Sequence, residues 1–300
     1  MNQKSLQILP GFWLKLIGML LMTLDHVGFF MMNVNYGVND TLFRVGYVFR
    51  CIGRAAMPLF VFFVAEAVRH SHKPWHYFLR LMILHAAISI IMSIYVYLIP
   101  NSPTPAEMSE NAFADLSLIA LALILFQQKG WKKALAALPI VFAAFVYVLQ
   151  VIEKAQDLTI DWFPRFLRPG YSLLGMLIGI GFYFSVPLAE RLAKKYAETS
   201  GIPFEAFQED KAYQRMKNVL AITMLFAVVV VFWGISYIGY NYDYRPYDNY
   251  LMQLQSYCLL AIPFLFLYSG KRGYDSKTFR IVTYLYYPVH LAILFLIFSL

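Results

Sequence analysis

The sequence predicts an all-α fold: a polytopic transmembrane helical bundle of about nine spans, with a count of ten left open. Of its 300 residues, 60% are hydrophobic and only 14% are charged, whereas a soluble domain carries roughly a quarter charged residues. The mean hydropathy is +0.57. Most of the chain is therefore expected to lie in lipid. The net charge of +8 is interpreted as a topological signal, and no nucleic-acid partner is expected.

Nine apolar segments approach the length of about 20 residues that a helix needs to cross a bilayer. The first begins near Gly11, is too long for a signal peptide and lacks a cleavage site, so we expect it to remain as a helix. A short interfacial helix is expected over 36–50, and the short fourth segment is the weakest prediction. The nine segments are 11–33, 51–68, 76–99, 112–128, 134–152, 170–189, 217–240, 250–269 and 280–300.

Charge placement predicts the orientation of the chain. Connections 100–111 and 241–249 hold almost no Lys or Arg, and 153–169 is a partial exception to the pattern. The alternate connections are rich in Lys or Arg: 69–73, 129–133, 191–217 and 271–280. The positive-inside rule then places the N-terminus in the cytoplasm and the C-terminus outside. We expect one domain over 1–300 in the bacterial cytoplasmic membrane, with 190–216 as a cytoplasmic connection.

Ionisable side chains inside a span are costly, so each marks a candidate functional site. Lys15 and His26 are separated by eleven residues, about three turns of 3.6 residues, and therefore share one face of the first helix. His26 is a candidate proton acceptor, and a hydrogen-bonded core histidine is the simpler alternative. Lys15 is expected near the cytoplasmic surface, where pairing with Glu66 or extension to the headgroups would also explain it.

Asp25 precedes His26 but points about 100° away from it on a helix. Its expected partner is Arg54, which lies at the outer end of the second span and four residues after Arg50. An arginine so placed offsets the burial of the carboxylate. Asp25 and His26 are therefore predicted to have separate roles in one layer of the bundle.

The last span contains Pro288 two residues before His290. Proline frees a backbone carbonyl and kinks the helix, which would turn His290 toward the interior of the bundle. In the predicted span 170–189, close helix packing explains Gly175, Gly179 and Gly181.

No P-loop, dinucleotide-binding, HExxH or GxSxG motif is present. No metal is expected, because His70, His72 and His76 fall in a predicted solvated turn.

Four blocks resemble the TraX family of membrane proteins from conjugal-transfer systems. They are residues 14–30 (LKLIGMLLMTLDHVGFF), 49–67 (FRCIGRAAMPLFVFFVAEA), 77–89 (YFLRLMILHAAIS) and 267–297, which ends in YLYYPVHLAILFLI. That family is associated with acetylation of pilin at its N-terminus. It is similar to a wider superfamily of transmembrane acyltransferases that acetylate glycans, including heparan-glucosaminide acetyltransferase. In those enzymes the first helix carries a basic residue, ten intervening residues and a histidine.

Lys15 and His26 have that spacing, with Lys in place of the more common Arg. The substitution keeps the positive charge but loses bidentate phosphate binding. The resemblance implies an acyltransferase that moves an acetyl or other short acyl group from cytoplasmic acyl-CoA to a hydroxyl or amine. The acceptor would belong to an envelope glycan, a lipid or a pilin-type protein.

The cofactor-binding residues expected for acetyl-CoA are Lys15, Arg80, Lys277 and Arg280. His26 would act as the general base, near Asp25. Arg54, together with His290, would stabilise the oxyanion. An acyl-histidine intermediate is the alternative mechanism. A transporter or flippase for a lipid-linked or anionic solute is the alternative function, since buried charges could also form a substrate or proton path.

Overall fold

The computed structural model describes residues 6–35, 37–98, 111–156, 158–241 and 254–299. Every regular element in these ranges is a helix, apart from one isolated β-bridge between Leu9 and Tyr268, so the all-α prediction is confirmed. The helices are α1 (Gly11–Asn35), α2 (Asp40–Gly53), α3 (Ala56–His70), α4 (Pro74–Leu98), α5 (Ala112–Phe126), α6 (Ala137–Gln156), α7 (Ser172–Ser200), α8 (Phe204–Glu209), α9 (Lys211–Asn241), α11 (Ile262–Leu267) and α12 (Lys277–Ser299).

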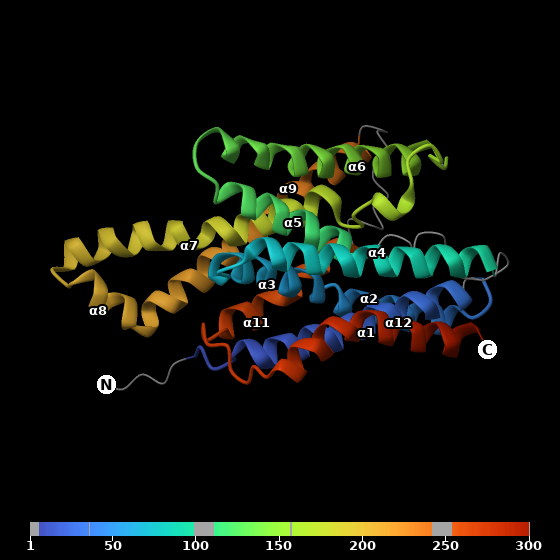
Figure 1. Cartoon of the computed structure of the whole chain (residues 1–300). Coiled ribbons are helices and arrows are strands. Elements are labelled where there is room, and N and C mark those ends of the chain that lie inside the picture. Colours follow the sequence, from blue (N-terminus) through green and yellow to red (C-terminus); the bar gives the residue numbers. More distant parts are fainter. Residues whose placement is uncertain (1–5, 36, 99–110, 157, 242–253, 300) are drawn as a thin grey trace.

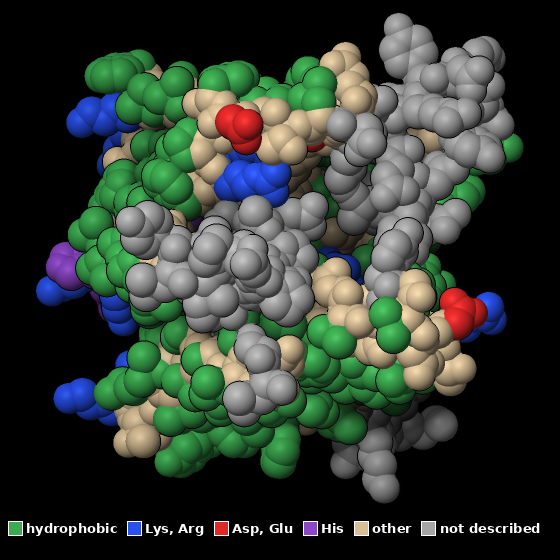
Figure 2. All heavy atoms as spheres, turned by 90° about the vertical axis from the view of Figure 1, so that its right-hand side faces the viewer, with side chains coloured by type: hydrophobic (Ala, Val, Ile, Leu, Met, Phe, Trp, Pro, Cys, Tyr) green, Lys and Arg blue, Asp and Glu red, His purple; other side chains and the backbone are tan. Residues whose placement is uncertain are grey.

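Seven helical stretches of the described chain are long and apolar enough to cross a membrane. Two shorter apolar helices, Ala112–Phe126 and Leu254–Leu267, occupy two further predicted segments. The multi-pass architecture is therefore confirmed, while the count of nine crossings and the orientation remain predictions. Figure 1 shows the long helices lying side by side, with the four basic connections at the end of the bundle where α1 begins. We call this the basic end. Figure 2 views the opposite end, where apolar side chains cover the visible flanks.

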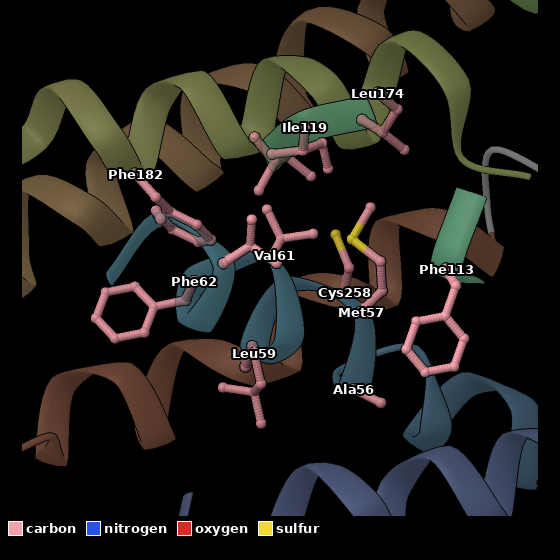
Figure 3. Packing of buried hydrophobic residues seen from close by; sticks show 14 of the residues in the cluster. Ala56, Met57, Leu59, Val61, Phe62, Phe113, Ile119, Leu174, Phe182 and Cys258 are labelled. Carbon is pink, nitrogen blue, oxygen red and sulfur yellow. The ribbon is translucent and has the colours of Figure 1, made fainter. Parts of the chain in front are cut away.

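Helix α3 lies at the centre of the bundle. Its sequence, AMPLFVFFVAEAVRH, is apolar on all sides through its first nine residues, as expected of a helix surrounded by other helices. Its buried side chains point toward residues of α5, α7 and the segment around Cys258 (Figure 3). Pro58 is tolerated because the first turn of a helix leaves its N–H groups unpaired in any case.

Helix α2 packs lengthwise against α1, in place of the short interfacial helix expected over 36–50. Glycines make this possible: Gly28 and Gly46 face each other's backbone, and a Cβ at Gly53 would lie 2.5 Å from the backbone nitrogen of Asp25. Only two residues separate α2 from α3, and Asp40–His70 forms one apolar stretch of 31 residues. About 20 Å of helix therefore precedes Arg54. Arg54 therefore lies well inside this stretch and not near its beginning, as the predicted span 51–68 had placed it, and its depth below a membrane surface remains a prediction.

The start of α1 is fixed by the segment that precedes α12. The N–H groups of Gly11 and Phe12 donate to the carbonyls of Lys271 and Arg272 at 2.8 and 2.9 Å. These bonds satisfy donors that the first turn of a helix cannot pair internally. The segment between α11 and α12 is thereby held across the basic end of the bundle.

Helices α7 and α9 extend past the bundle at the basic end and are joined through α8 (Figure 1). A small separate core of Ala193, Phe207 and Tyr213 holds these helices together. The predicted connection 190–216 is therefore largely helical. Nearer the centre, a Cβ at Gly179 would lie 2.5 Å from the Ile119 side chain. The predicted close packing at this glycine is confirmed, and its partner is α5 of the same chain.

Candidate active site

A cavity of about 540 Å³ runs along the interior of the bundle. Its walls come from α1, α3, α4, α5, α7, α12 and the segment 268–275. Charged residues at the basic end line one part of it, and Asp25, His26, Asp115 and Tyr171 line the part deeper in the bundle. Lys15 and His26 both line this cavity, so the prediction that they share one helix face is confirmed.

Asp25 and Arg54 form a buried ion pair at the deep end of the cavity. Arg54 donates from Nε to Oδ1 at 2.9 Å and from Nη2 to both carboxylate oxygens at 2.5 Å. Arg50 Nε lies 3.7 Å from Oδ1 of the same carboxylate. The predicted pairing is confirmed. Asp25 lines the cavity and Arg54 does not, so Arg54 is placed to orient the carboxylate.

His26 is hydrogen-bonded to His290, with 2.7 Å between Nδ1 of the first ring and Nε2 of the second. His290 Nδ1 lies 2.8 Å from the Tyr286 carbonyl oxygen, which can only accept, so this nitrogen carries the hydrogen. In a neutral ring Nε2 is then the acceptor, and His26 Nδ1 must donate to it. Neutral His26 therefore has an unprotonated Nε2, the form that a general base requires.

His290 is 7% exposed and contacts His26 from α12, which confirms that it faces the interior of the bundle. The ring of Tyr287 lies edge-on to both histidines, with centroid distances of 5.7 and 5.6 Å. Tyr286 stacks on His290 at 5.0 Å and its hydroxyl lies 2.6 Å from Thr23 Oγ1. These contacts from two helices fix the orientation of the imidazole pair.

Asp115 anchors the beginning of α7. Its carboxylate accepts hydrogen bonds from the backbone N–H groups of Gly170, Tyr171 and Ser172 at 2.9, 3.0 and 3.0 Å. An acidic side chain at this position also interacts favourably with the helix dipole. Ser172 has a φ of 40°, a value that is unfavourable for a residue with a Cβ, and the carboxylate holds the backbone in that conformation. Tyr171 is fixed beside Arg54 as a result.

The Tyr171 hydroxyl accepts a hydrogen bond from Arg54 Nη1 at 3.2 Å. The guanidinium carbon lies 5.9 Å from the tyrosine ring centroid. One connected group of polar side chains therefore joins α1, α5, α7 and the α2–α3 junction.

The basic end of the cavity is more open. Lys15, Arg80 and Arg280 line it, in agreement with their predicted common location. Lys277 begins α12, is exposed and does not line the cavity. Arg272, which sequence reasoning did not select, lines it instead.

Asp275 lies among these cations. Arg280 donates to its two oxygens at 2.7 Å, and Arg272 Nη1 lies 3.9 Å away. The Arg280 hydrogen bonds hold the pKa of Asp275 below its usual range. Lys15 lies over the ring of Phe63, 5.4 Å from its centroid. Glu66 is paired with Arg69 and contacts His70, so its ion pairs do not involve Lys15.

Sequence reasoning missed Tyr171 and Arg272. A tyrosine directly after Pro169 and Gly170 gives no chemical signal, because its importance depends on Asp115, 56 residues earlier in the chain. Arg272 lies in a basic connection that the positive-inside rule already explains. Only the hydrogen bonds between this connection and α1 show that it crosses the mouth of the cavity.

Together, the helices and this site define a helical multi-pass membrane protein with an internal cavity that joins exposed cations to buried polar residues. The sequence profile of the TraX protein family matches residues 11–163, and the chain belongs to this family. The matched part contains Lys15, Asp25, His26, Arg54 and Arg80. Comparisons with curated proteins and with solved structures gave no match.

Proposed function

We propose that this TraX-family chain is a membrane acyltransferase. It moves an acetyl or other short acyl group from cytoplasmic acyl-CoA to a hydroxyl or amine of an envelope glycan, lipid or pilin-type protein. One observation carries the proposal: a single cavity connects a group of cations with a histidine whose hydrogen bonds leave Nε2 unprotonated. This combination matches a donor that has an anionic head and a reactive thioester at the end of a long arm.

The donor is placed along the cavity by its charges. The CoA phosphates bind Lys15, Arg80, Arg272 and Arg280, because guanidinium and ammonium groups form strong charge-assisted hydrogen bonds with phosphate oxygens. The pantetheine arm then follows the wall that contains Phe60 and Phe63. Lys15 and His26 lie about 16 Å apart along α1. An elongated donor spans this distance, so its thioester lies beside the imidazole.

His26 acts as the general base. Its Nε2 removes the proton from the acceptor hydroxyl or amine while the acceptor oxygen or nitrogen bonds to the thioester carbon. His290 accepts the Nδ1 hydrogen bond and keeps the ring in the required tautomer, the role that a carboxylate has in serine hydrolases. The tetrahedral adduct then breaks its C–S bond, and the proton on His26 is transferred to the CoA sulfur.

Ligand binding tests this proposal. We expect CoA and acetyl-CoA to raise the melting temperature of the purified protein in lipid nanodiscs. Pantetheine, which lacks the nucleotide phosphates, should have a much smaller effect, and Lys15→Ala should weaken the CoA response. Membranes with the chain should also transfer label from acetyl-CoA to an acceptor that is unlabelled in membranes lacking it. Absence of both effects, with solute uptake by proteoliposomes, would replace the proposal with the transporter alternative.

A further inference from the structure

We propose that Tyr171 is a catalytic residue whose hydroxyl donates a hydrogen bond to the oxygen of the reacting acyl group. Arg54 and Asp115 are the positioning residues that hold it. This inference rests on the acyl-transfer function proposed above. It also changes the role expected for Arg54, which had been the predicted oxyanion donor.

The hydrogen bonds of Tyr171 leave its hydroxyl hydrogen available. Arg54 can only donate, so at 3.2 Å its Nη1–H points at the phenolic oxygen and that oxygen accepts. Within the described ranges, the Tyr171 hydroxyl forms no hydrogen bond besides the one that it accepts from Arg54. The side chain lines the cavity. The hydrogen is therefore placed to be donated to a ligand in that space.

Arg54 increases the strength of this donor. A hydroxyl whose oxygen accepts a hydrogen bond from a cation is polarised and donates more strongly through its own hydrogen. The guanidinium is held by three hydrogen bonds to Asp25 and is 5% exposed. Its charge is thus fixed behind Tyr171, away from the cavity, and acts on the acyl oxygen through the tyrosine hydroxyl.

The backbone of Tyr171 is fixed as firmly as its side chain. Asp115 accepts the N–H groups of this residue and of its two neighbours. The side chain is held by the hydrogen bond from Arg54 to its hydroxyl and by the guanidinium that lies 5.9 Å from the ring centroid. A donor that is oriented before the reaction stabilises developing charge without reorganisation, which is the physical basis of an oxyanion hole.

The base and the donor line the same cavity. Asp25, next to His26 in the chain, holds the arginine that contacts Tyr171. When the acceptor attacks, the carbonyl π electrons move to oxygen, and this oxyanion accepts the Tyr171 hydrogen bond. The negative charge returns to the carbon as the C–S bond breaks, and CoA leaves as a thiol with the proton from His26. Tyr171 keeps its own proton throughout.

The test uses inverted membrane vesicles that carry the full chain and its native acceptor, supplied with radiolabelled acetyl-CoA. Tyr171→Phe keeps the ring and removes only the hydroxyl. We expect kcat to fall by about 100-fold to 1,000-fold, the usual effect of removing one oxyanion donor, with the KM for acetyl-CoA changed less than threefold. Tyr196→Phe is the matched control, because Tyr196 lies on α7, the helix that Tyr171 directly precedes, is 53% exposed and does not line the cavity.

A second measurement separates hydrogen-bond donation from a structural role. Fluorinated tyrosines incorporated at position 171 change the donor strength of the hydroxyl while keeping the shape of the side chain nearly constant. We expect kcat to change steadily with the number of fluorine atoms at constant melting temperature. Suppose that the wild-type chain transfers acyl groups. An unchanged rate in Tyr171→Phe, or rates that do not respond to fluorination, would then overturn the proposal for Tyr171 and leave the proposed function intact. Absence of any acyl transfer by the wild-type chain would overturn both proposals.

Discussion

The two ends of the cavity hold their charged residues in different ways. At the deep end, Asp25, Arg54, Asp115 and His290 are each 8% exposed or less, and each is hydrogen-bonded to at least one other element. At the basic end, Arg80 and Arg280 are exposed. Fixed groups suit a reaction that needs defined geometry. Exposed cations on flexible stems suit a multiply charged ligand that must enter and leave.

The largest expected effect is on catalysis at the deep end. His26→Ala should lower the transfer rate by about 100-fold to 10,000-fold, the contribution typical of a general base. The increase in melting temperature that CoA causes should remain close to wild type, since His26 lies beyond the proposed phosphate contacts. Initial rates in vesicles and thermal unfolding in nanodiscs would measure the two quantities. Full activity in this variant would show that His26 is a core histidine with no role in the chemistry.

His290→Gln tests how much the second histidine contributes to the same reaction. Glutamine can still accept from His26 Nδ1 but cannot share a proton with the imidazole. We expect an intermediate loss of rate, because the tautomer is kept while the ring loses its partner base.

The second effect concerns stability and compares the ion pairs of the two ends. Arg54→Met leaves Asp25 buried without its main partner, which typically costs about 3–5 kcal/mol. Arg280→Met removes an exposed partner of Asp275 and should leave the melting temperature nearly unchanged. Thermal unfolding of both variants would measure the contrast.

A double variant tests the cause of that loss. Asp25→Asn combined with Arg54→Met removes both charges, so much of the lost stability should return. If the double variant were as unstable as Arg54→Met alone, packing around Arg54, and not its charge, would account for the effect.

The contrast between the ends also explains what the sequence could predict. Hydropathy predicts the helices, and helical periodicity places Lys15 and His26 on one face. The cost of burying a charge predicts the Asp25–Arg54 pair. Each of these signals is local or depends on one strong energetic term. The geometry at Tyr171 depends on Asp115 in another helix, and the 36–50 segment depends on glycines in α1 and α2 that meet only after folding.

The third effect is on donor affinity at the basic end and compares two cations from one connection. Arg272→Ala should raise the KM for acetyl-CoA by about threefold to tenfold with kcat maintained, because a single exposed phosphate contact contributes modestly. Lys277→Ala should change KM less, since Lys277 does not line the cavity. Rates across a range of acetyl-CoA and salt concentrations would give both values. A larger increase in KM for Lys277→Ala than for Arg272→Ala would favour Lys277, the residue predicted from the sequence, as the phosphate contact.

The smallest effect concerns Asp275, an acidic residue among the cations of this end. The Arg280 hydrogen bonds lower its pKa, so Asp275 is ionised at neutral pH and competes with a bound phosphate for Arg280 and Arg272. Asp275→Asn removes that competing charge and should tighten CoA binding by about twofold to fivefold, the range of an exposed ion pair.

The same carboxylate that weakens CoA binding should stabilise the folded protein at neutral pH. A lowered folded-state pKa means that the ion pair stabilises the protein above the pKa that Asp275 has in the unfolded chain. This contribution is lost as the pH falls through the lowered folded-state pKa, so the small difference in melting temperature between wild type and Asp275→Asn should vanish in acid. Weaker CoA binding in Asp275→Asn would instead mean that the carboxylate positions Arg280 for phosphate. The basic end would then share the fixed geometry of the deep end.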